Sequence, residues 1–231
     1  MKRLCTICVR GGSKGVPRKN AREIAGLPLV VHSIRQAQQT SLFDLISVSS
    51  DDEKILQMAK IEGVASILRP EELAMDTSPK LPAIVHAVLE SEKIFGDSFE
   101  TVVDLDATSP LRILSDINGA VNLLERGQLD SVFTASESKK SPFFNQVRIN
   151  DHGLWSTVIE QKRQITRRQD SPKVYDMNAS IYVWRRNKLI ENPKVFYERT
   201  EMFEMPGERS LDIDSELDFW IVERIMEWRK A

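Results

Sequence analysis

Apolar residues in the first 136 positions of the chain follow two alternating patterns. Short continuous apolar runs predict buried strands at residues 4–9, 44–50, 65–69, 101–107 and 131–136. Between these runs, apolar residues at helical spacing predict helices over 28–40, 51–63, 81–95 and 115–128. Continuous apolar strands separated by helices are typical of a mostly parallel sheet that is covered on both faces. The pattern therefore predicts a doubly wound α/β domain, in which ligands bind beyond the carboxyl ends of the strands.

The alternation stops near residue 138. Residues 138–175 contain short apolar stretches, turns and basic residues, with a hairpin signal, NDHG, at 150–153. An apolar strand at 179–184 then returns to the core, and a final helix begins near Ser215. We expect that helix to bury its apolar residues, which are Leu217, Trp220, Ile221, Ile225 and Trp228. The chain is thus predicted to be a single domain over 1–231, with an inserted segment at 138–175.

Composition narrows the function classes. The chain has 231 residues, 41% of them hydrophobic, which is enough for one substantial core. Its net charge of -2 does not suggest a general role on nucleic acids or membrane surfaces. No stretch approaches the roughly 20 apolar residues of a membrane span, and Arg10 interrupts the first apolar run too early for a signal peptide. Cys5 and Cys8 are three residues apart in a predicted strand, so they face opposite sides and are expected to be buried thiols in a reducing cytoplasm.

The first predicted strand leads into a glycine-rich basic loop, VRGGSKGVPRKN, at residues 9–20. The N–H groups of such a loop can cradle a phosphate chain. The loop has neither the Gly-Lys-Ser/Thr ending of a Walker loop nor the Gly-x-Gly-x-x-Gly spacing of the dinucleotide fingerprint. Its cations could neutralise a triphosphate, and a solvated basic turn is the alternative. These cations are Arg10, Lys14, Arg18 and Lys19.

A pair of carboxylates, Asp212 and Asp214, stands in the segment SLDIDSELD. Alternation with Leu211 and Ile213 would direct both carboxylates to one side of an extended backbone. Two hard oxygen ligands side by side suit Mg²⁺, which proteins hold with one or two carboxylates plus substrate phosphates. The alternative is that Asp214 or Ser215 caps the final helix, a role that is compatible with metal binding.

Two further segments carry candidate polar chemistry. Asp106 and Thr108 follow a buried strand in DLDATSPLR, at the edge where doubly wound sheets hold ligands. A plain turn between strand and loop is the alternative. Arg167 and Arg168, in QITRRQD, could clamp a carboxylate or a phosphate, or could be ordinary solvated arginines.

Taken in chain order, these segments resemble the acylneuraminate cytidylyltransferases, also called CMP-sialic acid synthetases. The resemblance spans essentially the whole chain. Its motifs are RGGSKGVPRKN, RPEELAMDTSPKLPAIVHAV (69–88), ATSPLR (107–112), RRQD (167–170), NASIYV (178–183) and DIDSELD (212–218). It implies a Rossmann-like nucleotidyltransferase fold. It also implies Mg²⁺-dependent transfer of CMP from CTP to the anomeric hydroxyl of a nine-carbon 2-keto sugar acid, with release of pyrophosphate.

The resemblance assigns roles to single residues. For nucleotide binding it implies Arg10, Gly11, Gly12, Ser13, Lys14, Lys19, Asn20, Arg69 and Lys80. For the sugar it implies Asp106, Thr108, Arg167, Arg168 and Asn178, and for Mg²⁺ it implies Asp212 and Asp214. The implied catalytic residues are Arg10, Lys19, Arg167, Asp212 and Asp214. Residues 138–175 are implied to form a β-rich dimerisation arm that reaches the partner's site in a cytoplasmic homodimer.

Departures from the family pattern concern the sugar pocket. Asp106 and Lys80 stand where many sialic acid enzymes carry glutamine and serine, and Phe143 and Phe144 where some relatives carry a lysine. These changes put N-acetylneuraminate in doubt and keep legionaminic and pseudaminic acids as candidate substrates. The alternatives are a cytidylyltransferase for a Kdo-type eight-carbon sugar and a non-catalytic module that binds nucleotide sugars. The general base stays open between the two carboxylates at 212 and 214 and a metal-bound hydroxide.

Overall fold

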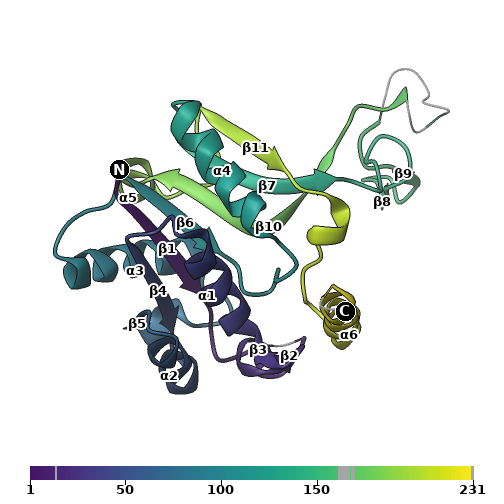
Figure 1. Ribbon diagram of the computed structural model, residues 1–231. Coiled ribbons are helices and arrows are strands. Elements are labelled where there is room, and N and C mark those ends of the chain that lie inside the picture. Colours follow the sequence, from purple (N-terminus) through teal and green to yellow (C-terminus); the bar gives the residue numbers. More distant parts are fainter. Residues whose placement is uncertain (14, 161–166, 168–169, 230–231) are drawn as a thin grey trace.

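A seven-stranded sheet forms the centre of the computed structural model, which describes residues 1–13, 15–160, 167 and 170–229 (Figure 1). The strand order is β11-β7-β10-β6-β1-β4-β5. The strands are β1 (Arg3–Cys8), β4 (Leu45–Ser50), β5 (Ala65–Leu68), β6 (Thr101–Leu105), β7 (Ser131–Glu137), β10 (Tyr175–Arg185) and β11 (Thr200–Glu204). Strand β10 runs antiparallel to β6 and β7, and the other pairs are parallel. The predicted mostly parallel sheet is confirmed.

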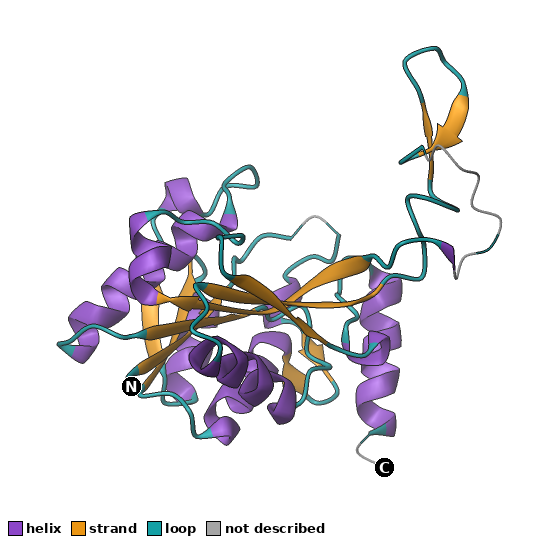
Figure 2. Cartoon of the chain, turned by 90° about the horizontal axis from the view of Figure 1, so that it is seen from above, coloured by secondary structure: helices purple, strands orange, loops and turns teal. Residues whose placement is uncertain are grey.

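Helices cover both faces of this sheet (Figure 2). Their bounds are α1 (Leu29–Thr40), α2 (Glu53–Ile61), α3 (Lys80–Phe95), α4 (Leu114–Arg126) and α5 (Arg186–Glu191). Apolar residues of α1, α2 and α4 form one buried cluster with Cys5, whereas those of α3 and α5 form a second with Cys8. The two cysteines are therefore free, buried and on opposite faces, as their spacing predicts. None of the described helices is long and apolar enough to cross a lipid bilayer.

Local sequence accounts for several element boundaries. The Asp52 carboxylate caps α2 by accepting the N–H of Lys54, and Gly96 ends α3 in the left-handed conformation, with φ of 79°. A small hairpin of β2 (Glu23–Ile24) and β3 (Leu27–Pro28) precedes α1. Short 3₁₀ helices occur at η1 (Lys19–Ala21), η2 (Glu71–Leu73) and η4 (Gly207–Arg209).

Residues 138–175, called the arm below, contain a second hairpin that projects away from the sheet (Figure 2). It pairs β8 (Val147–Ile149) with β9 (Trp155–Thr157). The side chain of Asn150 closes the turn by accepting the N–H of His152 and of Leu154, and Gly153 has a positive φ of 76°. The hairpin predicted from NDHG at 150–153 is thus present.

The final helix, α6 (Glu216–Trp228), faces the core differently from the prediction. Phe219 and Val222 are buried, in a cluster with apolar residues of the glycine-rich loop and of β2. Ile221 and Ile225 are half-buried, whereas Leu217, Trp220 and Trp228 are 65%, 58% and 78% exposed. The prediction that these last three are buried was wrong. Apolar residues occur on several sides of this helix, so their periodicity does not identify the face that contacts the core.

Candidate active site

The glycine-rich loop leaves the carboxyl end of β1 and is fixed on both sides. The N–H of Gly11 donates to Asp51 Oδ1 at 3.0 Å, and the side-chain amide of Asn20 donates to the Arg10 carbonyl at 2.9 Å. At Gly15, a Cβ atom would lie 1.9 Å from the carbonyl oxygen of Asp214. Only glycine therefore permits this approach, which brings the loop against the acidic segment at 212–214.

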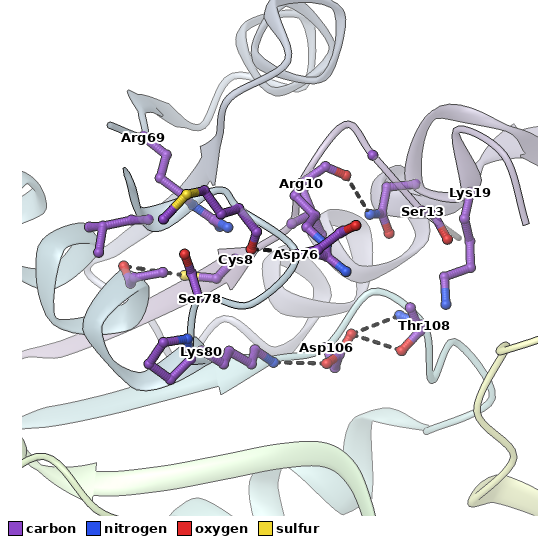
Figure 3. Close-up of a pocket in the computed structure, with 17 residues that line it drawn as sticks. Cys8, Arg10, Ser13, Lys19, Arg69, Asp76, Ser78, Lys80, Asp106 and Thr108 are labelled. Carbon is purple, nitrogen blue, oxygen red and sulfur yellow. Dashed lines mark hydrogen bonds and ion pairs between the residues drawn. The ribbon is translucent and has the colours of Figure 1, made fainter. Parts of the chain in front are cut away.

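A cavity of about 280 Å³ opens beside this loop (Figure 3). It lies beyond the carboxyl ends of β1 and β6, the edge at which a doubly wound sheet binds ligands. Nine residues with predicted roles line it, namely Arg10, Gly12, Ser13, Lys19, Asn20, Arg69, Lys80, Asp106 and Thr108. The fold thus brings together residues that are nearly 100 positions apart in the sequence.

The cations of the cavity have different surroundings. Arg10 forms a partly exposed ion pair with Asp76 at 2.9 Å, which an incoming anion could replace. Lys19 is buried, and its ammonium contacts the Ile213 carbonyl and lies 3.7 Å from Asp214. Arg69 is also buried and donates to the Ser49 carbonyl at 2.8 Å. Lys14 lies outside the described residues.

An ion cluster forms the floor of the cavity. The Lys80 ammonium lies 2.8 Å from one carboxylate oxygen of Asp104 and 2.8 Å from one of Asp106. The other oxygen of Asp106 accepts the N–H and the hydroxyl of Thr108, at 3.0 and 2.9 Å. Burial opposes both charges, yet the carboxylates raise the pKa of Lys80, while Lys80 and Thr108 lower the pKa of Asp106 to about 2. Lys80 and Asp106 are therefore both ionised at neutral pH.

Arg112 holds the loop that follows β6. Its guanidinium is 2% exposed and donates to the carbonyls of Asp106 and Ser180, at 2.7 and 3.0 Å, and to the hydroxyl of Ser33. Burial lowers the pKa of Arg112 to about 10, so the side chain stays charged at neutral pH. Arg112 thereby fixes the backbone at which Asp106 and Thr108 enter the cavity.

The acidic pair occupies two environments. Ile213 is buried between the two carboxylates, and its N–H donates to the Thr108 carbonyl at 3.0 Å. Asp212 is half-buried, and its Oδ1 is a buried oxygen without a hydrogen-bond partner in the described chain. Burial raises the pKa of Asp212, repulsion from Asp106 and Asp214 adds to this, and Thr108 and Lys19 oppose it. The Asp214 side chain, by contrast, is 79% exposed.

Ser215 caps α6, as one alternative predicts. Its hydroxyl accepts the N–H of Asp218, and the Asp218 carboxylate accepts the N–H of Ser215 at 2.8 Å. Within the described ranges, no group of three or more His, Cys, Asp and Glu side chains could hold a metal ion. A cation on Asp212 and Asp214 therefore needs further oxygens from water or from a substrate.

Three predicted sugar residues do not line the cavity. Arg167 lies on the arm and is exposed, and Arg168 lies outside the described residues. Asn178 is buried, where it accepts from the Thr134 hydroxyl at 2.6 Å and donates to the Ser210 hydroxyl at 2.9 Å. Its amide thus joins β7 and β10 to the segment before α6, and its contact with a sugar stays a prediction.

Asp104 and Arg112 were not assigned a role from the sequence. The sequence does contain a signal for Asp104, because an acidic residue within the buried strand TVVDL requires a polar or charged partner. Its partner Lys80 is 24 positions away, and only the folded chain brings the two together. Arg112 lies within ATSPLR, but its buried contacts with Ser33 and Ser180 leave no local pattern.

Comparisons with known proteins show which family the chain matches. Residues 4–226 match a family described as cytidylyltransferase. The chain is 42% identical to post-translational flagellin modification protein B of Campylobacter coli, over 97% of this chain and 94% of that protein. It is 43% identical to CMP-N,N'-diacetyllegionaminic acid synthase of Campylobacter jejuni, over 95% of this chain and 93% of that protein.

More distant similarities extend this result. The chain is 31% identical to N-acylneuraminate cytidylyltransferase of Streptococcus agalactiae, over 95% of this chain but 52% of that protein. The structure of a CMP:2-keto-3-deoxy-manno-octonic acid synthetase complexed with CTP matches with a TM-score of 0.72 and 16% identity, over 99% of this chain and all of that one. At that identity the match supports the fold alone.

Proposed function

The chain belongs to the cytidylyltransferase family of nucleotidyltransferase enzymes, and we propose that it transfers CMP from CTP to a nine-carbon 2-keto sugar acid of the sialic acid type. The observation that carries the proposal is the convergence of the basic loop, Asp106 and Thr108 around one cleft, with the acidic segment packed against that loop at Gly15. In the reaction, the anomeric hydroxyl of the sugar attacks the α-phosphorus of CTP. The bond between the α-phosphorus and its bridging oxygen breaks, and pyrophosphate leaves.

The loop supplies charge and N–H donors for the phosphates. Arg10 exchanges Asp76 for a phosphate oxygen, and Lys19 neutralises charge that develops on pyrophosphate. Ser13 and Gly12, which line the cleft, would offer a hydroxyl and an N–H group to the same phosphates. Asn20 and Arg69, on the cavity wall, hold the cytidine. Most of the catalysis is then positioning and charge neutralisation, as is usual for phosphoryl transfer.

Asp212 and Asp214 fit a Mg²⁺ ion. The buried, unpartnered oxygen of Asp212 is the kind of hard ligand that Mg²⁺ prefers, and the exposed Asp214 carboxylate would contribute a second. When bound, Mg²⁺ supplies positive charge that stabilises the phosphates. The chain's own contribution is to hold the two carboxylates through Ile213 and the capped start of α6. The two carboxylates also remain candidates for the general base.

The sugar is proposed to be a bacterial nonulosonic acid of the diacetyllegionaminic type. The supporting observation is the 43% identity to the Campylobacter jejuni synthase over 95% of this chain. An eight-carbon Kdo-type substrate has weaker support, because the matching synthetase is 16% identical to this chain. A module that binds without catalysis has no specific support, since the cationic loop and both carboxylates are in place.

The arm is proposed to act on the cleft of a second copy. Arg167 is exposed on an arm that projects away from its own sheet, and it does not line its own cleft (Figure 2). In a homodimer, Arg167 and Arg168 of one chain would then meet the sugar carboxylate in the site of the other. Symmetric dimers make such an exchange reciprocal, so both sites would be completed in the same way.

An assay of pyrophosphate release tests the proposed function. With Mg²⁺, CTP and N,N'-diacetyllegionaminic acid, we expect pyrophosphate and a CMP-sugar in equal amounts, and no release when the sugar is omitted. ATP and UTP in place of CTP should give little product, because Asn20 and Arg69 face the base. Equal turnover with UTP or ATP would contradict the assignment, as would the absence of product from every nonulosonic acid in a panel that includes N-acetylneuraminic and pseudaminic acids.

A further inference from the structure

The ion cluster under the cleft holds the Lys80 ammonium between the carboxylates of Asp104 and Asp106. Asp104 is fully buried, and its second carboxylate oxygen accepts the hydroxyl of Thr6 at 2.9 Å. A buried carboxylate is stable only while it is paired, and Lys80 is its counter-ion at 2.8 Å. Lys80 cannot move towards a triphosphate without leaving that charge unpaired. Its ammonium is therefore a fixed group on the floor of the cleft.

The hydrogen-bond capacity of this cluster is only partly used. An ammonium has three N–H bonds, and that of Lys80 donates a hydrogen bond to Asp106 and forms an ion pair with Asp104. A carboxylate has about four acceptor positions, and Asp106 uses three, for Lys80 and for the two groups of Thr108. The Lys80 and Asp106 side chains are 35% and 19% exposed, and both line the cleft. The two side chains lie side by side (Figure 3), so the cleft offers an ammonium donor next to a carboxylate acceptor.

The charge of the cluster indicates what it recognises. The Lys80 ammonium lies 2.8 Å from a carboxylate oxygen of Asp104 and 2.8 Å from one of Asp106, so its positive charge is balanced within the cluster. An ammonium that is balanced in this way attracts phosphates and the carboxylate of a sugar acid less than an unpaired ammonium does. The cluster suits an uncharged group that offers an acceptor next to a donor, which is the chemistry of an acylamino group or of sugar hydroxyls.

We propose that Lys80 and Asp106 form one recognition unit for the uncharged substituents of the sugar acid, and that Asp104 is the positioning residue of this unit. The inference rests on the proposed function and reassigns Lys80 from the nucleotide to the sugar. Thr6 and Asp104 act from beneath and touch no substrate. A lysine without Asp104 would keep its charge but lose its fixed position, and Asp106 would lose its orientation with it.

The test is the variant Asp104→Asn, measured with saturating CTP and varied sugar. Asparagine keeps the shape and can still accept from Thr6, but it removes the charge that holds Lys80. We expect the KM for the sugar to rise about tenfold and the KM for CTP to change less than about twofold. We also expect the variant to lose part of the discrimination between two sugar acids that differ only by an acetamido or a hydroxyl group at one carbon.

A matched control separates positioning from stability. Asp130 is another buried carboxylate, paired with Arg199 at 2.9 Å, at the amino end of β7 and away from the cleft. Asp130→Asn should lower the melting temperature without changing the ratio of the two KM values. If Asp104→Asn does not fold, the double variant Lys80→Gln, Asp104→Asn removes both charges together and should show the same selective rise in the sugar KM.

The outcomes distinguish this inference from the proposed function. A wild-type enzyme without turnover on any sugar acid would contradict the proposed function itself. An active wild type whose Asp104→Asn variant raises the KM for CTP, and leaves that for the sugar unchanged, would overturn the inference and return Lys80 to the nucleotide. Equal KM changes in Asp104→Asn and Asp130→Asn would reduce Asp104 to a structural role and overturn the inference as well.

Discussion

The cleft and the arm are held together in different ways. In the cleft, contacts join segments that are far apart in the sequence, as with Gly15 against Asp214 and Lys80 on Asp104. In the arm, the hydrogen bonds of the turn join near neighbours such as Asn150 and Leu154, and Trp155 is 72% exposed. Figure 2 shows the same contrast, with a layered core and a hairpin that projects from it. A single chain thus builds the cleft, whereas the apolar side chains of the arm are available to another surface.

The largest loss of activity is expected from a substitution at Gly15, where the loop lies directly against the Asp214 carbonyl. Gly15→Ala would place a methyl group 1.9 Å from the Asp214 carbonyl, so the loop or the acidic segment must move. Because a displacement of about 1 Å at a catalytic site can cost about 100-fold, kcat/KM should fall by at least that factor. Gly207→Ala is the matched control, because a Cβ atom there meets nothing within 4 Å, and it should stay within about twofold of wild type. Near-normal kinetics in Gly15→Ala would mean that the loop and the carboxylates are not coupled.

A second prediction concerns the unequal carboxylates. Asp212→Asn should lower kcat about 100-fold and Asp214→Asn about tenfold, because Asp212 is partly buried with a free oxygen and Asp214 is 79% exposed. The raised pKa of Asp212 makes it protonate at a higher pH than an exposed aspartate. The activity of the wild type should therefore fall at acid pH as Asp212 becomes protonated. The pH profile of Asp212→Asn should lack this fall. Full activity in both variants would leave Asp214 and Asp212 as parts of a helix cap only.

The contrast between cleft and arm also explains what the sequence could predict. Strands β1, β4 and β6 lie in apolar runs, so the local pattern predicts these strands. It also predicts that the residues after their carboxyl ends lie at the ligand-binding edge. Strand β11 (Thr200–Glu204) is an edge strand in which no residue is fully buried, and it carries no comparable signal. The buried face of α6 depends on Phe219 meeting the loop after β1, where the Arg22 guanidinium lies 4.1 Å from its ring centroid. Tertiary contacts alone decide that choice.

Within the site, the sequence predicts the residues that follow the strands. It does not predict the buried residues that hold them in place, which are Asp104 and Arg112. Arg10, Asp106 and Thr108 stand in segments of unusual composition, and they line the cleft. Asp104 and Arg112 have partners that lie 24 or more positions away, at Lys80, Ser180 and Ser33, and Arg112 also donates to the nearby Asp106 carbonyl. Buried polar contacts of this kind carry no periodicity, because each is satisfied by a single long-range neighbour.

Mixing two inactive variants tests most directly whether one chain's cleft is completed by another chain's arm. Asp212→Asn damages the cleft, and Arg167→Ala damages the arm. In a mixed dimer, one site receives both lesions and the other neither, so random exchange should restore about one quarter of wild-type pyrophosphate release. Native mass spectrometry would establish that exchange has occurred. Recovery near that level is the predicted result. Proven mixed dimers with no recovered activity would contradict it and place Arg167 at its own chain's site, and full activity of Arg167→Ala alone would place Arg167 outside the reaction.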